Sequence, residues 1–212
     1  MGFASDGHVT YSYSTGTVTF AEIFAGGFVG YASRGTISDC NSLTDVCCSG
    51  SRSGGFVGQN YAVLFSRCYS AGHVENAESL FGGFCGYDYN NTITTSCFWD
   101  TQTSGQNNSN GGTDKSNTQM KTQGTFTEWD FTTGTGIWEI ETGSALSYPY
   151  LRQNAQSPVP GHVTVDLTGS GTTLDPYQIT NLEDLRYLSW HSIIWSATFI
   201  QTTDLDASAT TG

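Results

Sequence analysis

The sequence predicts an all-β protein, a right-handed parallel β-helix (solenoid) with 28-residue repeats, a capping segment and one or two short helices. Three observations lead to this prediction. A glycine-bracketed pentapeptide recurs at a fixed step, the residues after each copy recur with it, and the short runs between turns alternate apolar and polar side chains without a helical period. Crossover connections between parallel strands are almost always right-handed, which predicts the hand.

The pentapeptide occurs three times, and its first glycines are separated by 54 − 26 = 28 and 82 − 54 = 28 residues. Self-similarity at a period of about 20–50 residues is typical of solenoids. The glycines are expected to permit tight turns and close packing of successive coils, and the phenylalanine is expected to point inward. The structural residues predicted in these copies are Gly26, Gly27, Phe28 and Gly30, then Gly54, Gly55, Phe56 and Gly58, then Gly82, Gly83, Phe84 and Gly86.

The repeat continues beyond the pentapeptide. Eleven residues after each first glycine stands an apolar residue that is expected to face inward, and a cysteine follows it three or four residues later. These residues are Ile37, Phe65 and Ile93, followed by Cys40, Cys68 and Cys97. Residues 7–18 show the same frame, so residues 1–100 hold four copies, the first incomplete. Each copy offers short strands of about 3–5 residues that stack on their equivalents in the next copy.

Cysteine serves in these repeats as a small buried apolar side chain, because three of the six cysteines share one repeat position. Coils about 4.8 Å apart would also allow a disulfide between neighbouring cysteines, so free thiols and disulfides both stay open. Cys47 and Cys48 are adjacent. Because neighbours in a strand point to opposite faces, at most one of them is expected to point inward.

The stretch Gly54-Gly55-Phe56-Val57-Gly58-Gln59-Asn60 resembles the GLUG-motif repeats, and the resemblance covers residues 2–100. Such repeats occur in large secreted or surface proteins of bacteria and some archaea, including adhesin-like proteins and IgA-cleaving peptidases. Cys97-Phe98-Trp99-Asp100 and Tyr148-Pro149-Tyr150-Leu151-Arg152 resemble the closing segment that follows the last repeat in many such proteins. The resemblance implies a fold and a location. It brings no catalytic residues, since the zinc motif of the peptidase members is absent.

Residues 101–152 are interpreted as the closing cap segment. Residues 101–112 read as a polar loop that projects from the solenoid. A short helix should follow, because Ser116 and Gln119 fit a capping box and Met120 offers an apolar contact to the solenoid end. The aromatic and aliphatic residues between 129 and 151 have the composition to cover the open last coil.

Residues 153–165 are interpreted as a linker, because Pro158 and Pro160 hold the chain extended and deny ladder hydrogen bonds. Residues 166–212 read as the start of a second solenoid unit, with an entry strand and a capping helix. Thr180 and Glu183 fit a second capping box. Leucines 182, 185 and 188 lie on one helical face, and residues 199–205 return to strand.

Composition favours an extracellular or cell-surface location. Seven Lys and Arg stand against 19 Asp and Glu, which gives a net charge of −12. Nucleic acid and anionic membranes need clustered basic residues, so both are excluded as partners, and no apolar run reaches the length of a spanning helix. The chain begins inside a motif without a recognisable signal peptide. It is therefore read as part of a longer surface protein, or as a subunit that joins others head to tail into a filament.

The sequence predicts no enzyme, no cofactor and no metal centre. The acidic residues Asp39, Glu75, Glu78 and Asp88 share no repeat offset, which argues against a polysaccharide-cleaving groove. The four histidines are scattered. Calcium at Asp204 and Asp206 is a weak alternative, because two carboxylates two residues apart are commonplace.

The predicted function is that of a non-catalytic structural or adhesin-like repeat protein. Its partners would be copies of itself, other domains of a longer chain, or glycans and neighbouring surface proteins. The alternative is a carbohydrate- or protein-binding module, because several aromatic residues stand near turns where their faces could stack on a ligand. These residues are Tyr61, Tyr87, Tyr89, Phe98 and Trp99. Asn90 and Asn107 begin glycosylation sequons.

Overall fold

The computed structural model describes residues 3–19, 23–48, 51–76, 80–90, 93, 96–142, 146–154, 156, 167–182, 184–185, 188 and 196–205. The chain forms two compact units, Met1–Gly161 and His162–Gly212. The division falls within the predicted linker 153–165, most of which lies outside the described residues. Strands dominate the described chain and its helices are short. None of these helices is long and apolar enough to cross a membrane.

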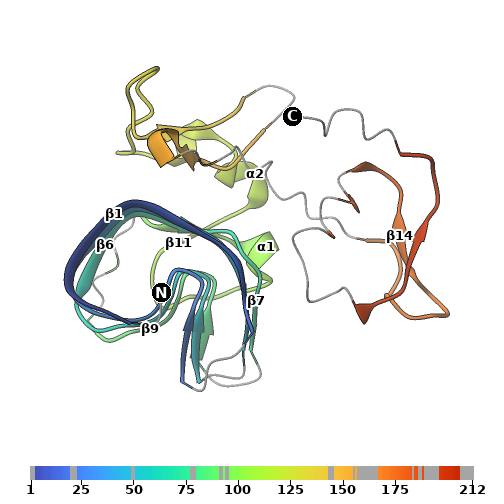
Figure 1. Cartoon of the computed structure of the whole chain (residues 1–212), viewed down its shortest axis with the longest axis horizontal. Helices are drawn as coiled ribbons and strands as arrows, with labels where there is room; N and C mark the ends of the chain where they lie inside the picture. Colours follow the sequence, from blue (N-terminus) through green and yellow to red (C-terminus); the bar gives the residue numbers. More distant parts are fainter. Residues whose placement is uncertain are drawn as a thin grey trace. The chain divides into compact units, whose positions relative to one another are not determined.

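The first unit is built around a curled parallel sheet (Figure 1). Its strands are β1 (Phe3–Val18), β2 (Phe24–Gly26), β3 (Val29–Cys48), β4 (Arg52–Gly54), β5 (Val57–Asn60), β6 (Val63–Ser70), β7 (Val74–Asn76), β8 (Leu80–Gly82), β9 (Cys85–Asp88), β10 (Phe98–Asp100), β11 (Thr113–Lys115), β12 (Trp138–Glu139) and β13 (Tyr150–Leu151). The main sheet has the order β11-β10-β6-β3-β5-β9, with β1 and β7 also paired to β3. A smaller parallel sheet has the order β2-β4-β8.

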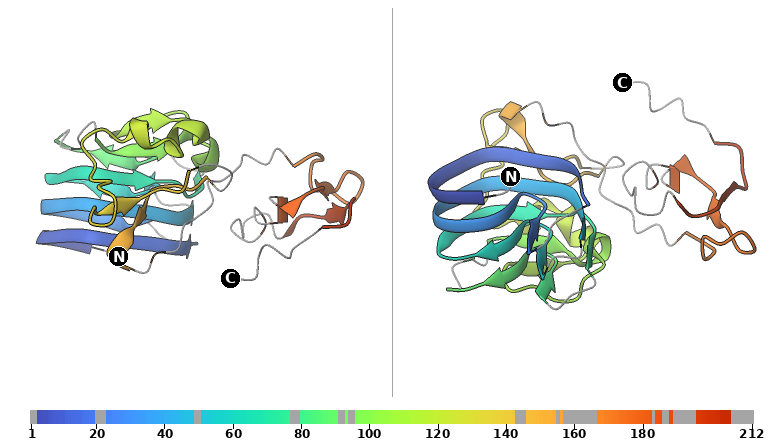
Figure 2. Two further views of the ribbon diagram at one scale, coloured as in Figure 1. Left: turned by 90° about the horizontal axis from the view of Figure 1, so that it is seen from above. Right: turned by 60° about the horizontal axis from the view of Figure 1, so that its bottom comes forward.

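The strands lie in successive levels, seen edge-on in the left view of Figure 2. We call the described residues of 3–19 level 1, of 23–48 level 2, of 51–76 level 3 and of 80–100 level 4. Each level pairs in parallel with the next at equivalent positions of the sequence pattern. Ser12 pairs with Cys40, for example, and Cys40 pairs with Cys68.

Two of the strands are much longer than the predicted runs, since β1 has 16 residues and β3 has 20. Pairing resumes on the far side of each corner: Ser5 pairs with Ser33 and Gly7 with Gly35, while the corner residues between them are skipped. The corners carry positive φ angles at Asp6 (54°), Arg34 (58°) and Ala62 (115°), and at Tyr11 (50°), Asp39 (54°) and Arg67 (48°). A left-handed residue bends the chain without ending the ladder, so one assigned strand spans several sides of a level.

The core lies inside the curled sheet. Phe56 is fully buried, and its ring stacks on Phe28 below and Phe84 above with centroid separations of 4.7 and 4.8 Å. Phe65 packs against this column edge-on, at 5.8 Å from Phe56. Stacked equivalents therefore fill the interior without a gap between levels.

The polar segment 101–112 does not project, contrary to the sequence prediction. It contains α1 (Thr101–Ser104), which Asp100 caps by accepting hydrogen bonds from the backbone amides of residues 102 and 103. Its second half lies along level 4: Ser109 Oγ accepts from the backbone amide of Cys85 at 2.9 Å, and the Asn110 amide donates to the Cys85 carbonyl at 3.0 Å. Strand β11 then pairs with β10. The segment is ordered because its small polar residues satisfy backbone groups that level 4 would otherwise leave unpaired.

The short helix α2 (Asn117–Met120) confirms the first predicted capping box. Ser116 Oγ accepts from the backbone amide of Gln119, and the Gln119 side chain accepts from the backbone amide of Ser116. Met120 is fully buried in a cluster with Tyr69 and Phe98. A 3-10 turn, η1 (Gln123–Thr125), follows.

The described residues of 126–156, which we call the side segment, pack beside the levels and not over the last one as predicted. They include the antiparallel pair β12–β13 and the turn η2 (Arg152–Asn154). Trp129, Trp138, Tyr148 and Leu151 are buried against Tyr69 and Phe98. In the left view of Figure 2 the yellow and orange side segment runs across the stacked strands. The side segment therefore holds the levels to one another, while residues 101–115 cover the end of the stack.

The second unit contains β14 (Tyr177–Ile179) and β15 (Phe199–Gln201), which pair in parallel. Residues 182, 184, 185 and 188 between them are helical. The predicted box of Thr180 with Glu183 involves a residue outside the described set. The observed reciprocal cap joins Asn181 and Asp184: Asn181 Oδ1 accepts from the amide of Asp184 at 3.0 Å, and the Asp184 carboxylate accepts from the amide of Asn181 at 3.1 Å.

Candidate functional site

The repeat glycines lie where successive levels approach most closely. A Cβ atom on Gly27 would overlap the backbone carbonyl of Gly55, and one on Gly55 would overlap that of Gly83. A Cβ on Gly83 would overlap the indole of Trp99. None of the repeat glycines has a positive φ, so these positions are restricted to glycine by close approach and not by turn conformation. The same holds for Gly26, Gly54, Gly82, Gly58 and Gly86, whose Cβ atoms would overlap backbone atoms.

The apolar and cysteine positions of the repeat line the interior. Ile37 and Phe65 are buried, Ile93 is partly buried against the same core, and Cys40, Cys68 and Cys97 are fully buried. All six cysteines are free thiols. Burial raises the pKa of the Cys68 thiol well above its usual range, and burial also raises that of Cys85. The Cys68 and Cys85 thiols are therefore protonated at neutral pH and serve as packing groups.

Cys47 and Cys48 differ in burial, as expected for adjacent residues of one strand. Cys48 is buried, and its thiol donates to the Val18 carbonyl at 3.2 Å, whereas Cys47 is half-buried. Burial and the neighbouring carboxylates Asp45 and Glu75 raise the pKa of Cys47 to about 11. Cys47 is therefore also a protonated thiol at neutral pH.

Opposite charges meet across levels at equivalent positions, a feature that the sequence reading missed. Arg67 binds the buried carboxylate of Asp39 through two hydrogen bonds of 2.7 Å, and Trp138 Nε1 donates to the same carboxylate at 3.4 Å. Arg34 pairs with Asp6 in the same way on the exposed side. Each pair is separated by one repeat in the sequence. An acidic and a basic residue separated by 28 residues is the sequence signal that could have predicted these ion pairs.

Two further acidic residues, Asp88 and Asp100, are held in structural contacts. Asp88 accepts from the Asn60 side chain and from the backbone amide of Ile93. Asp100 is fully buried and accepts from Tyr148 Oη at 2.8 Å and Asn117 Nδ2 at 3.0 Å. Burial raises the pKa of Asp100 although these hydrogen bonds oppose the shift. Glu75 is exposed, and Glu78 lies outside the described residues.

In the part of the chain that the structure describes, no three His, Cys, Asp or Glu side chains cluster as metal ligands. Asp204 is exposed, whereas Asp206 lies outside the described residues, so the calcium alternative stays a prediction. His8 contacts Thr36, and the His73 ring contacts the Thr103 carbonyl. Both sequon asparagines, Asn90 and Asn107, are exposed.

The aromatic residues that were candidates for ligand stacking divide into two groups. Phe98 and Trp99 are buried, so neither residue offers a ring for the alternative of ligand stacking. They pack because level 4 needs side chains to fill its interior and to meet the side segment. Tyr61 and Tyr89 are 41% and 56% exposed, and their ring centroids lie 5.1 Å apart. Tyr87 is half-buried against Tyr89 and the Arg52 guanidinium.

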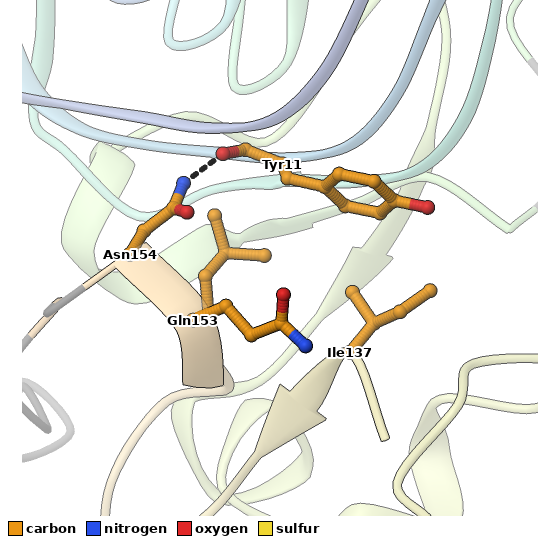
Figure 3. Close-up of a pocket in the computed structure, with 5 residues that line it drawn as sticks. Tyr11, Ile137, Gln153 and Asn154 are labelled. Atoms are coloured by element: carbon orange, nitrogen blue, oxygen red, sulfur yellow. Dashed lines mark hydrogen bonds between the residues drawn. The ribbon is translucent and has the colours of Figure 1, made fainter. Parts of the chain in front are cut away.

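A cleft of about 170 Å³ lies between level 1 and the side segment. Figure 3 shows the Tyr11 ring on one side, with the Ile137 side chain and the Gln153 amide directed toward the same space. Leu151 and Asn154 complete its lining. The Asn154 side-chain amide donates to the backbone carbonyl of Tyr11, which ties the two walls together. No sequence pattern predicted this cleft, because its walls come from segments far apart in the chain.

Comparison of the chain with protein families, with curated proteins and with solved structures gave no match.

Proposed function

We propose that this chain is a non-catalytic structural protein of adhesin-like type at the cell surface or outside the cell. In this proposal residues 1–100 form a right-handed parallel β-helix of 28-residue GLUG-type repeats. The observation that carries it is the column Phe28–Phe56–Phe84, in which equivalent residues stack at 4.7 and 4.8 Å. A chain that places each repeat on the last is built to extend.

The chemistry of the described side chains supports a non-catalytic role. A general acid or base has to reach a substrate with a proton to exchange. Here Asp39 is occupied by Arg67, Asp100 caps a helix from a buried position, and the Cys68 thiol is protonated and fully buried. These three buried groups therefore serve the fold.

The edge of β1 supports assembly. Within the described residues β1 pairs only with β3, so one side of a 16-residue strand carries backbone groups without a strand partner. Residues 108–115 cover the opposite end of the stack. An uncovered strand edge is a template for another strand. In the proposed filament, the 166–212 segment of one chain continues the stack at β1 of the next, which is a head-to-tail contact.

Negative-stain electron microscopy with size-exclusion light scattering tests this assembly. The proposal expects fibres or oligomers that disappear when Thr10→Lys and Thr15→Lys place charges on the exposed positions of β1. Thr118→Lys, on the exposed side of α2, is the matched control and should leave assembly unchanged. A monomer at every concentration would contradict the filament and leave the proposal of a spacer within a longer surface protein.

A carbohydrate- or protein-binding module is the second candidate. It is favoured by Tyr61 and Tyr89, which present an exposed aromatic pair next to the sequon residue Asn90. Its partners would be glycans or neighbouring surface proteins. Tyr61→Ala with Tyr89→Ala should abolish adhesion to a glycan array or to cells while leaving thermal unfolding nearly unchanged. Unchanged adhesion would contradict this candidate.

A further inference from the structure

The cleft beside Tyr11 has the composition of a small neutral binding site. Tyr11 supplies an aromatic ring, Ile137 and Leu151 supply aliphatic surface, and Gln153 supplies a primary amide that both donates and accepts hydrogen bonds. None of the five lining residues is charged. The nearby Arg152 is already bound to Glu139 at 2.6 Å and to the Gly136 carbonyl. The cleft therefore offers no free cation to an anionic ligand.

We propose that this cleft binds one ring of a neutral pyranose sugar. The apolar C–H face of a pyranose packs against an aromatic ring, and its hydroxyl groups need partners that donate and accept at once. Among the described residues the Gln153 amide has no hydrogen-bond partner, so it is free for those hydroxyls. At about 170 Å³ the cleft is smaller than the roughly 300–1,000 Å³ of drug-sized ligand sites, which suits a single ring with the rest of a glycan in solvent.

Comparison with the next levels shows why a cleft forms at level 1. The positions equivalent to Tyr11 in levels 2 and 3 are Asp39 and Arg67, which bind each other. Trp138 of the side segment packs there and donates to Asp39. Level 1 has no such ion pair: Tyr11 remains 49% exposed, and the side segment meets its backbone through Asn154. A space is left between the ring and the side segment.

The backbone at Tyr11 has the same conformation as the equivalent corners of levels 2 and 3. Its φ of 50° compares with 54° at Asp39 and 48° at Arg67, so the left-handed corner belongs to the fold and not to the cleft. What distinguishes the corner of level 1 is the tyrosine ring, which stands where the next two levels carry a charged side chain.

The cleft includes Tyr11 of β1, the strand whose edge the proposed filament uses, but it is separate from the Tyr61–Tyr89 pair. It deepens the binding-module candidate by naming a ligand class. Saturation-transfer difference NMR on the full chain tests it with the methyl pyranosides of glucose, galactose, mannose and N-acetylglucosamine. We expect at least one to receive saturation with a Kd in the millimolar range, as befits one ring on a small surface.

Two variants locate the site and two controls keep the result clear. Tyr11→Asn removes the ring but suits the left-handed corner, so the chain should fold at least as stably as before. Gln153→Ala removes the amide from an exposed side chain. Each should weaken binding at least tenfold. Tyr61→Ala and Thr118→Lys should leave binding unchanged, which separates the cleft from the tyrosine pair and from surface charge.

The proposal is overturned if none of the four glycosides receives saturation. It is also overturned if Tyr11→Asn and Gln153→Ala bind as the parent chain does, or if Tyr61→Ala is the variant that loses binding. In the last case the binding-module candidate survives at the tyrosine pair, while the cleft does not. Thermal unfolding of each variant confirms that lost binding is not lost folding.

Discussion

The interior of levels 1–4 and the cluster that the side segment forms against the levels both bury apolar side chains, but they are built by different rules. In the interior, Phe56 meets Phe28 and Phe84, its own equivalents one repeat away. In the side segment, Tyr69 donates to the Pro149 carbonyl 80 residues on, and Asn41 exchanges two hydrogen bonds with Gln156 at a separation of 115 residues. Repetition organises the first region, and individual complementarity organises the second.

This difference predicts different responses to damage. An interior residue supports both neighbouring levels, so its loss should weaken the whole stack together. A residue of the side segment holds levels that already pair through their backbones. Its loss should free the segment before the stack unfolds.

Phe56→Ala should have the largest effect. The ring is fully buried between two stacked rings, so its removal leaves a cavity at the centre of the column and should lower the free energy of unfolding by about 4 kcal/mol. Urea unfolding followed by tryptophan fluorescence measures it. Phe28→Ala is the matched control, because Phe28 stacks on one ring and should cost about 1 kcal/mol less. An equal loss at the two positions would contradict the column as the unit of stability.

Trp138→Ala should come next, with a loss of about 3 kcal/mol in the side segment. Trp138 is fully buried and lies 4.5 Å from the Trp129 ring. Hydrogen exchange should show fast exchange in residues 126–154 while the amides of β3 and β6 keep their protection. If the amides of β3 lost protection to the same extent, the side segment would be part of the same cooperative unit as the levels.

Removing the cation opposite Asp39 should cost about 2 kcal/mol. The carboxylate of Asp39 is only 2% exposed. In Arg67→Met it loses both hydrogen bonds from the guanidinium and keeps only the longer one from Trp138 Nε1 at 3.4 Å. Chemical denaturation of the double variant Asp39→Asn/Arg67→Met provides the comparison. It should recover at least half of the loss, because no buried charge is left unpaired. Additive losses would show that the two residues act independently.

Asp45→Asn should have the smallest effect and the opposite sign. Burial raises the pKa of Asp45 from 3.8 to about 6, although the His73 backbone amide donates to it at 2.8 Å. The folded chain therefore binds a proton that the unfolded chain releases, so the parent loses stability as pH rises from about 4 to 6. The asparagine variant should be more stable by about 1 kcal/mol at pH 7.5 and no more stable at pH 3.5, as measured by thermal unfolding. Equal gains at the two pH values would contradict the raised pKa.

The sequence predicted well wherever one residue contacts its own equivalent. Spacing alone pointed to Phe28, Phe56 and Phe84 as a set, and the structure buries all three. The box of Ser116 with Gln119 was readable because both partners lie within one turn. The corner residues and the Asp39–Arg67 pair were readable in principle at the same spacing, but their side chains differ, so identity of residue type did not reveal them.

The position of the segments without repeats was predicted wrongly. The composition of 101–112 is that of an exposed loop, yet Ser109 and Asn110 pair with level 4 because that edge has backbone groups to satisfy. The side segment was expected over the last level, but it lies beside the levels: Trp129 donates to the Ser96 carbonyl of level 4, and Asn154 donates to the Tyr11 carbonyl of level 1. Burial of apolar surface was predictable, and its location was not.

The sequence by itself determined the stacking partners, because residues at the same position of successive repeats lie next to each other in the stack. Tertiary structure alone decided where the side segment lies, which end of the stack is covered, and that Tyr11 faces a cleft. The physical reason is that the two kinds of contact differ in how they depend on sequence separation. Parallel pairing of equivalents is encoded at a constant separation, whereas contacts such as Asn41 with Gln156 arise from the fit of whole surfaces and leave no periodic trace in the chain.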